Sequence, residues 1–139
     1  MCGITGIIGK GARQHEKAAQ KMTDCLAHRG PDGQGVAVFD NAILGHRRLS
    51  IIDLSTGNQP MYTTDKSVCL VFNGEIYGYQ DIKKELSKYP FQTSSDTEVI
   101  LALYETYGEK FLDKLPGMFS FALWDEKKQT LIAGRDRFG

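Results

Sequence analysis

The hydrophobic and polar positions along the chain predict more strands than helices. Strand-like patterns occupy residues 2–9, 36–39, 42–52, 68–72, 118–124 and 130–133. The first alternates glycine with isoleucine, and Gly3 and Gly6 predict that another group, such as a ligand, approaches this backbone closely. The continuous apolar run 68–72 is typical of a strand covered on both faces. The last two segments are separated by a polar turn and predict a hairpin.

Helical spacing is confined to two segments. The first, residues 15–28, ends at the turn residues 30–33, and its apolar positions are Ala18, Met22, Cys25 and Leu26. The second begins at Ser95, which forms a capping-box pattern with Glu98, and it ends at Gly108. Its apolar stripe is Val99, Ile100, Leu103, Tyr104 and Tyr107. Because tight turns join neighbouring strands, we expect antiparallel sheets covered by helices, an α+β layered fold.

Composition narrows the class of protein. The chain has 139 residues, of which 41% are hydrophobic, and 17 basic residues balance 17 acidic ones. We therefore expect one globular domain over residues 1–139, with no electrostatic footprint for nucleic acid. The longest apolar run is too short to span a membrane and no secretory signal is evident, so a cytoplasmic protein is expected. Three widely spaced cysteines suit neither a disulfide framework nor a structural zinc site, and no metal site is expected.

Cys2 is the first candidate for chemistry. Removal of Met1 would leave this thiol beside its own α-amine, whose pKa of about 8 makes it a built-in base. The alternative is that Cys2 is simply a small residue entering a strand. Cys25 and Cys69 lie within apolar patterns and are interpreted as inert core thiols.

Asn73 and Gly74 allow two interpretations, and both can hold together. The pair is a strong hairpin signal and predicts a type I′ turn after the run 68–72. The side-chain amide of Asn73 and the backbone N–H of Gly74 could also act as two donors to an oxyanion at the edge of a buried sheet.

Two charged residues fall on apolar faces. Arg48 and Arg47 must point in opposite directions along a strand, so one guanidinium points inward. Its partner would be the carboxylate of a ligand or an internal one such as Asp53, and the sequence leaves these even. Asp96 heads the buried stripe of the second helix; it could serve as a helix cap or bind a ligand ammonium.

Several short motifs then follow in order along the whole chain. They are MCGI at the start, HRGPDG at 28–33, GHRRLSIID at 45–53, GNQPM at 57–61, VFNGEIY at 71–77, SSDTEVIL at 94–101, GMFSFALWD at 117–125 and GRDRFG at the end. With them the sequence resembles the class II glutamine amidotransferases, and among these the N-terminal glutaminase domain of glutamine-hydrolysing asparagine synthetases. The resemblance implies a four-layer αββα sandwich similar to N-terminal nucleophile hydrolases, with two antiparallel sheets between helical layers.

The resemblance also implies residue roles. A terminal Cys2 would attack the carboxamide of L-glutamine, form a γ-glutamyl thioester and release ammonia, after which water frees glutamate. Asn73 and Gly74 would form the oxyanion hole. Arg48 would bind the substrate α-carboxylate, and Asp96 with the Glu75 segment would bind its α-ammonium. The remaining implied pocket residues are Leu49, Ser50, Ile51 and Ile52, and Arg29 would shape the surroundings of the nucleophile.

The match departs from the family at two places. Gly78 stands where many relatives have asparagine, just outside the oxyanion pair. Relatives continue beyond Gly139 with further strands and an ATP-dependent synthetase domain, so we expect an incomplete type 2 amidotransferase domain. ATP, Mg²⁺ and the aspartate acceptor would then belong to the missing domain, and the partners would be L-glutamine and that domain, with a homo-oligomer possible. The alternatives are an amidotransferase domain serving another acceptor and a non-catalytic glutamine-binding relative.

Overall fold

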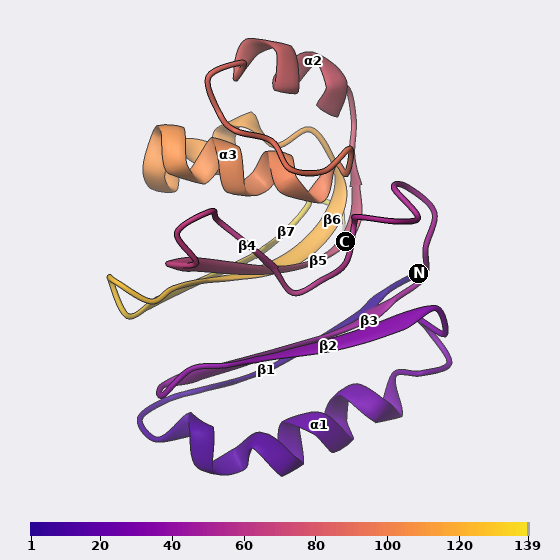
Figure 1. Ribbon diagram of the computed structural model, residues 1–139, viewed down its shortest axis with the longest axis vertical. Helices are drawn as coiled ribbons and strands as arrows, with labels where there is room; N and C mark the ends of the chain where they lie inside the picture. The colour runs from indigo at the N-terminus through magenta and orange to yellow at the C-terminus, as the bar shows by residue number, and fades with distance from the viewer. Residues whose placement is uncertain (139) are drawn as a thin grey trace.

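Two antiparallel sheets face each other in the computed structural model of the chain, which describes residues 1–138 (Figure 1). The first sheet has the order β1-β3-β2, from β1 (Gly3–Ile8), β2 (Gly33–Val38) and β3 (Ala42–Arg48). The second has the order β4-β5-β6-β7, from β4 (Met61–Tyr62), β5 (Val68–Ile76), β6 (Gly117–Asp125) and β7 (Thr130–Arg135). Every strand pairing in both sheets is antiparallel, as the tight turns predicted.

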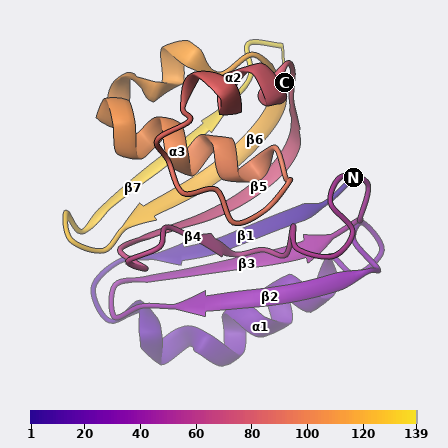
Figure 2. The same cartoon turned by 45° about the horizontal axis from the view of Figure 1, so that its top comes forward.

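Helices cover the outer face of each sheet and complete the four layers (Figures 1 and 2). The 3-10 helix Ala12–His15 and α1 (Glu16–Cys25) lie on the first sheet. The helix α3 (Thr97–Tyr107) lies on the second sheet with α2 (Tyr79–Glu85) beside it, and the 3-10 helix Gly108–Lys114 follows. The predicted αββα sandwich is confirmed. Within residues 1–138, no helix has both the length and the apolar character needed to cross a membrane.

The layer between the sheets is apolar over most of its length. We call it the inter-sheet layer; its buried apolar residues are Ala37, Ala42, Leu44, Cys69, Val71 and Trp124. The strand 68–72 is buried on both faces, as predicted, because α3 covers its other side. Cys69 is a core thiol, and burial raises its pKa to about 12.

Two strand predictions are wrong in instructive ways. The strand predicted to reach residue 52 ends at Arg48, and the segment 49–52 is a loop. Asn73 and Gly74 do not form a turn, because β5 runs straight through them to Ile76. The reason is tertiary: β6 pairs with β5 along its whole length, including opposite both residues, so the sheet overrides the local turn preference.

The first helix buries a different face from the one predicted. Ala19 and Thr23 are buried, whereas Ala18 and Cys25 are exposed and Met22 is 41% exposed. Gly45 of β3 explains the choice, because its missing side chain makes room for the Thr23 hydroxyl. Cys25 is therefore not a core thiol, and this prediction is wrong.

The prediction that a ligand lies against the glycines of β1 is also wrong. A side chain on Gly3 would collide with Leu26, and one on Gly6 would press on Leu44 and on the backbone of Ile43. The close approach was correctly anticipated, but the protein's own side chains make it.

The helix predicted from Ser95 to Gly108 is confirmed, but its N-terminal detail differs. Ser95 Oγ accepts a hydrogen bond from the N–H of Thr97 at 3.1 Å. The carboxylate of Glu98 accepts instead from the N–H groups of Gln92 and Thr93, both at 2.7 Å, so the reciprocal capping box does not form. Tyr107, predicted to be in the buried stripe, is half-exposed.

Candidate active site

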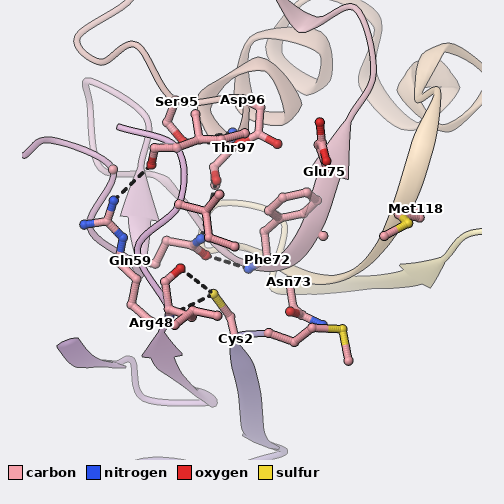
Figure 3. Close-up of a pocket in the computed structure, with 16 residues that line it drawn as sticks. Cys2, Arg48, Gln59, Phe72, Asn73, Glu75, Ser95, Asp96, Thr97 and Met118 are labelled. Atoms are coloured by element: carbon pink, nitrogen blue, oxygen red, sulfur yellow. Dashed lines mark hydrogen bonds between the residues drawn. The ribbon is translucent and has the colours of Figure 1, made fainter. Parts of the chain in front are cut away.

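A pocket of about 170 Å³ lies at one end of the inter-sheet layer (Figure 3). This is small compared with the roughly 300–1,000 Å³ of sites for drug-sized ligands, and it suits a molecule the size of an amino acid. The sheet register brings its residues together. Gly3 pairs with Arg47, so Cys2, just before β1, lies opposite Arg48 at the end of β3. Both line the pocket, with Asn73, Gly74 and Asp96 from the second sheet and the start of α3.

Backbone groups hold the thiol of Cys2. The N–H of Leu49 donates to Cys2 Sγ at 3.3 Å, and the thiol in turn points to the Leu49 carbonyl at 3.6 Å. Arg29 Nε donates to the carbonyl oxygen of Cys2 at 3.0 Å. The side chain is half-buried and free of any disulfide. Arg29, implied only by resemblance, thus fixes the backbone that carries the thiol.

The backbone N–H of Gly74 has no hydrogen-bond acceptor among residues 1–138 because it lies on the edge of β5 that faces away from β6. Antiparallel pairing with β6 leaves the N–H and C=O groups of alternate residues pointing to the other side. There Leu70 pairs with Met61 of β4, and the Ile76 N–H donates to Asp96 Oδ2 at 3.0 Å. Phe72 N–H donates to Gln59 Oε1 at 2.6 Å. Between Phe72 and Ile76, the N–H of Gly74 faces the pocket, and no side chain or loop of residues 1–138 accepts from it.

Asn73 completes the pair of donors. Side chains alternate along β5, and Cys69 and Val71 face the first sheet, so Asn73 faces it too. The amide therefore lies on the side of Cys2, and Figure 3 places both residues at the same pocket wall. Gly74 tolerates no side chain here, since a Cβ would collide with the Met118 carbonyl and with Phe119 of β6.

Arg48 is the arginine that points inward. It is 6% exposed, and its guanidinium donates to Asn58 Oδ1 at 3.0 Å and to backbone carbonyls of the following loop, those of Ile52, Asp53 and Leu54. The internal partner considered for it is absent, because the Asp53 carboxylate binds Thr56 and the Ser94 N–H. Within the described chain no carboxylate pairs with Arg48, so its charge is available to an anion in the pocket.

Arg47 points to the opposite face, as the strand period requires. It forms an ion pair with Asp24 of α1 at 3.0 Å. The two adjacent arginines therefore have different environments, one structural and one in the pocket.

Asp96 supplies the opposite charge. It is 3% exposed and lies at the start of α3, where burial raises the pKa of its carboxyl despite the hydrogen bond from Ile76. No lysine or arginine of residues 1–138 forms an ion pair with it. The pocket thus contains an unpaired cation and an unpaired carboxylate, an arrangement complementary to the two charges of a free amino acid.

Most of the loop predicted to line the pocket does so. Leu49, Ile51 and Ile52 are pocket residues, and so is Glu75 on β5. Ile51 lies at the rim and is 75% exposed. Ser50 is not among the lining residues; its N–H donates to Asp32 Oδ2 at 2.8 Å, away from the pocket.

Gln59 and Thr97 are pocket residues that the sequence reasoning missed. Gln59 accepts from Phe72 N–H, and its Nε2 lies 3.4 Å from Thr97 Oγ1, so it joins β5 to the start of α3. The only signal was GNQPM at 57–61, a motif with no obvious structural need. The other lining residues not predicted are Met1, Gly57, Phe72, Ser95 and Met118. Across residues 1–138, no three His, Cys, Asp or Glu side chains form a group that could hold a metal ion.

Comparisons with known proteins give the context of this geometry. The glutamine amidotransferase domain family matches residues 1–139. Asparagine synthetase B [glutamine-hydrolyzing] of Escherichia coli is 48% identical over 142 residues, which cover all of this chain and 26% of that protein. Glutamine-hydrolyzing asparagine synthetases of rice and maize are 44% and 45% identical and are covered to 24%. The chain spans about a quarter of the length of these curated relatives.

The fold has a counterpart among solved structures. Glutamine phosphoribosylpyrophosphate amidotransferase from B. subtilis superposes with a TM-score of 0.76 at 24% identity. The match covers 98% of this chain and 37% of that one. It shows the same fold, which agrees with the two facing sheets and their helical layers.

Proposed function

This chain belongs to the glutamine amidotransferase domain family, and from that membership we propose that it hydrolyses L-glutamine to glutamate and ammonia at Cys2. One observation supports this most. A thiol lies at the wall of a pocket that has unpaired charges of both signs, Arg48 and Asp96, and an open backbone donor at Gly74. Such a pocket can bind the amino-acid end of glutamine and present its carboxamide to the sulfur.

The substrate would be held by its charged end. Arg48 would donate to the α-carboxylate, and Asp96, with the Glu75 segment of β5, would accept from the α-ammonium. Leu49, Ile51 and Ile52 would contact the methylene chain. Binding would satisfy both buried charges together, which is favourable because an unpaired buried charge is costly.

The α-amine of Cys2, once Met1 is removed, would take the thiol proton. Sγ would then attack the side-chain carbonyl carbon, and the negative oxygen would accept from Asn73 Nδ2 and Gly74 N–H. Collapse would break the C–N bond, return the proton to the leaving nitrogen as ammonia and leave a γ-glutamyl thioester. Attack by water, deprotonated by the same amine, would release glutamate and the free thiol.

Met1 must be absent for this chemistry. In the peptide bond to Met1, the nitrogen of Cys2 is an amide and cannot act as a base. Met1 also lines the pocket. The carbonyl of Cys2 is held by Arg29 independently of Met1, so removal leaves the thiol in place.

We further propose that the ammonia is used to form asparagine. The support is the 40–48% identity to asparagine synthetases over the whole chain. In that assignment aspartate, ATP and Mg²⁺ act in a synthetase domain of the same protein, and this domain needs no cofactor. A thiol nucleophile and an exposed Cys25 suit a reducing compartment, and we propose the cytoplasm.

Labelling with an electrophilic analogue of glutamine tests the glutaminase. The purified chain is incubated with the diazoketone analogue, and adducts are located by intact mass and peptide mapping, which also report whether Met1 is present. We expect one adduct, on Met-free Cys2, with the exposed Cys25 unmodified as an internal control. Excess glutamine should protect Cys2.

Two results would contradict the proposal. One is a folded, Met-free chain that gains no adduct and releases no glutamate. The other is a chain that glutamine stabilises thermally without turnover, which would identify a binding relative. The acceptor is tested separately, by asking whether a longer protein containing this chain converts aspartate to asparagine with ATP.

A further inference from the structure

His46 lies directly behind the proposed nucleophile. On the inner face of the first sheet, Cys2 is opposite Arg48, and the next row contains Ile4 opposite His46. His46 is fully buried between the sheets, between Leu44 of the apolar layer and Arg48 of the pocket. It is not among the residues that line the pocket with Cys2, so it does not touch the substrate site itself.

The imidazole joins the two sheets. Its Nε2 lies 3.0 Å from the carbonyl oxygen of Phe72 on β5. Among residues 1–138, this is the one side-chain hydrogen bond that connects a strand of the first sheet to a strand of the second. It therefore links the sheet that carries Cys2 to the strand that carries Asn73 and Gly74.

The tautomer follows from the partner. A carbonyl oxygen can only accept, so Nε2 carries the proton and Nδ1 has the lone pair. Nδ1 is buried and has no hydrogen-bond partner in the part of the chain described. Burial lowers the pKa of His46 to about 4, and the nearby Arg48 charge acts in the same direction. The ring is thus a neutral donor to Phe72, with one buried acceptor atom left unsatisfied.

The bond acts on the peptide that precedes Asn73. The carbonyl of Phe72 and the N–H of Asn73 belong to one planar unit. His46 holds the carbonyl on one side, while the ladder with β6 holds the other side through Asn73 and its partner Ser120. Where β4 no longer pairs with β5, the backbone groups on this edge of β5 form hydrogen bonds, within residues 1–138, with side chains only. This plane ends at the Cα of Asn73, from which both the Asn73 side chain and the next peptide unit, with the Gly74 N–H, depart.

We propose that His46 is a positioning residue that sets the oxyanion donors Asn73 and Gly74 relative to Cys2, through the hydrogen bond to Phe72. The inference rests on the proposed glutaminase function. Arg48 and Asp96 bind the substrate ends and do not depend on this bond. Removing it therefore weakens stabilisation of the tetrahedral intermediate and leaves ground-state binding intact.

The kinetic test compares two variants in the full chain. His46→Leu removes the donor, and His46→Gln retains an N–H of similar reach. We expect His46→Leu to lower kcat for glutamine hydrolysis about 10- to 100-fold with KM within about twofold, the pattern of a transition-state interaction. His46→Gln should recover most of kcat. Equal kcat in a folded His46→Leu variant, or a change in KM alone, would overturn the inference.

A second measurement is independent of turnover. In ¹⁵N-histidine-labelled wild-type protein, His46 should show a protonated Nε2 and a free, pyridine-like Nδ1, with no titration between pH 5 and 8. Amide hydrogen exchange at Asn73, which pairs with Ser120 of β6, should be faster in His46→Leu than in wild type. A protonated Nδ1, or unchanged exchange, would overturn the inference even if the chain proves inactive on glutamine. Inactive wild-type protein with the expected tautomer and exchange would refute the glutaminase proposal alone.

Discussion

The two ends of the inter-sheet layer are built from the same strands and differ completely in character. At the closed end, β3 and β5 contribute Ala42, Leu44, Cys69 and Val71, which pack with Trp124. At the open end, the same two strands contribute Arg48 and Asn73. The two ends differ in strand pairing. At the closed end β4 pairs with β5, and at the open end β5 has no strand partner on that edge within residues 1–138. The pocket therefore lies where one edge of β5 has no strand partner in the described chain and side chains form the hydrogen bonds that a strand would otherwise form.

Among changes at the open end, removal of the Cys2 thiol should have the largest effect. Cys2→Ala should lower kcat for glutamine hydrolysis by about 10³-fold or more, since no other thiol of residues 1–138 lines the pocket. Glutamate release measures it. Cys25→Ala removes an exposed thiol that does not line the pocket and should keep parental kcat. Parental turnover in Cys2→Ala would exclude a cysteine mechanism at this position.

Next in size is the loss of an oxyanion donor. Asn73→Ala should lower kcat about 10²- to 10³-fold with little change in KM, because the donor acts on the tetrahedral intermediate. Steady-state kinetics measure both constants. The control is Asn41→Ala, which loses a hydrogen bond to Gln129 at the closed end and should leave kcat unchanged. A rise in KM in place of the fall in kcat would show that Asn73 binds substrate only.

Substitution of the two adjacent arginines should affect glutamine binding differently. Arg48→Lys keeps the charge and loses the fork geometry, so KM for glutamine should rise about 10- to 100-fold, as expected for a lost charge-assisted bond. Arg47→Lys changes a residue on the outer face, paired with Asp24, and should leave KM within about twofold. Similar KM changes in both variants would mean that the inward position has no special role.

Asp96 gives a smaller effect that depends on pH. Burial raises its pKa, so the free folded protein binds this proton more tightly than the unfolded chain does. The resulting stabilisation is present at low pH and is lost as pH rises through the folded pKa. Asp96→Asn should therefore raise Tm at pH 7 by a few degrees, the shift that about 1 kcal/mol produces in a domain of this size.

The same titration should appear in catalysis. In wild type, kcat/KM should fall as pH drops through the raised pKa of Asp96, because the protonated acid no longer attracts an ammonium. Asp96→Asn should lose that acid limb and have a lower kcat/KM at every pH. For the stability prediction, a lower Tm of Asp96→Asn than of wild type at pH 7 would contradict the interpretation of Asp96 as an unpaired buried carboxylate.

The smallest effect is expected at Ser50. Its side chain is not part of the pocket, so Ser50→Ala should change KM and kcat by less than about twofold, like other substitutions that remove no contact. Ile52→Ala, at a lining position in the same loop, is the matched comparison and should raise KM more. A large effect at Ser50 alone would mean that the loop rearranges around the substrate.

Much of the pocket was predictable from local patterns. The strand period placed Arg47 and Arg48 on opposite faces, and the helix period placed Asp96 on the buried one. Which arginine points inward was not predictable, because that depends on which face of the first sheet packs against the second sheet and which packs against α1. The gathering of Cys2 and Asn73 came from the family resemblance, since Cys2 precedes β1 of the first sheet and Asn73 lies on β5 of the second.

The errors share a cause. Asn73 and Gly74 have the composition of a turn, yet pairing with β6 keeps them extended. The apolar residues of 49–52 suggested a strand, but they form the wall and rim of a pocket. Gln59 gave no local signal because its amide replaces a missing strand partner for Phe72. In each case a contact from elsewhere in the chain decides the outcome.

The hydrogen bonds of Arg48 determine which positions of the following loop can accept substitutions during evolution. Three of its acceptors are backbone carbonyls, those of Ile52, Asp53 and Leu54, which every amino acid supplies. Sequence drift at Leu54 would therefore leave the guanidinium in place. Gly57 and Asn58 lack this freedom, because a side chain at 57 would press on the guanidinium and the amide of 58 is an acceptor. Within one loop, adjacent positions should differ sharply in the substitutions that they accept.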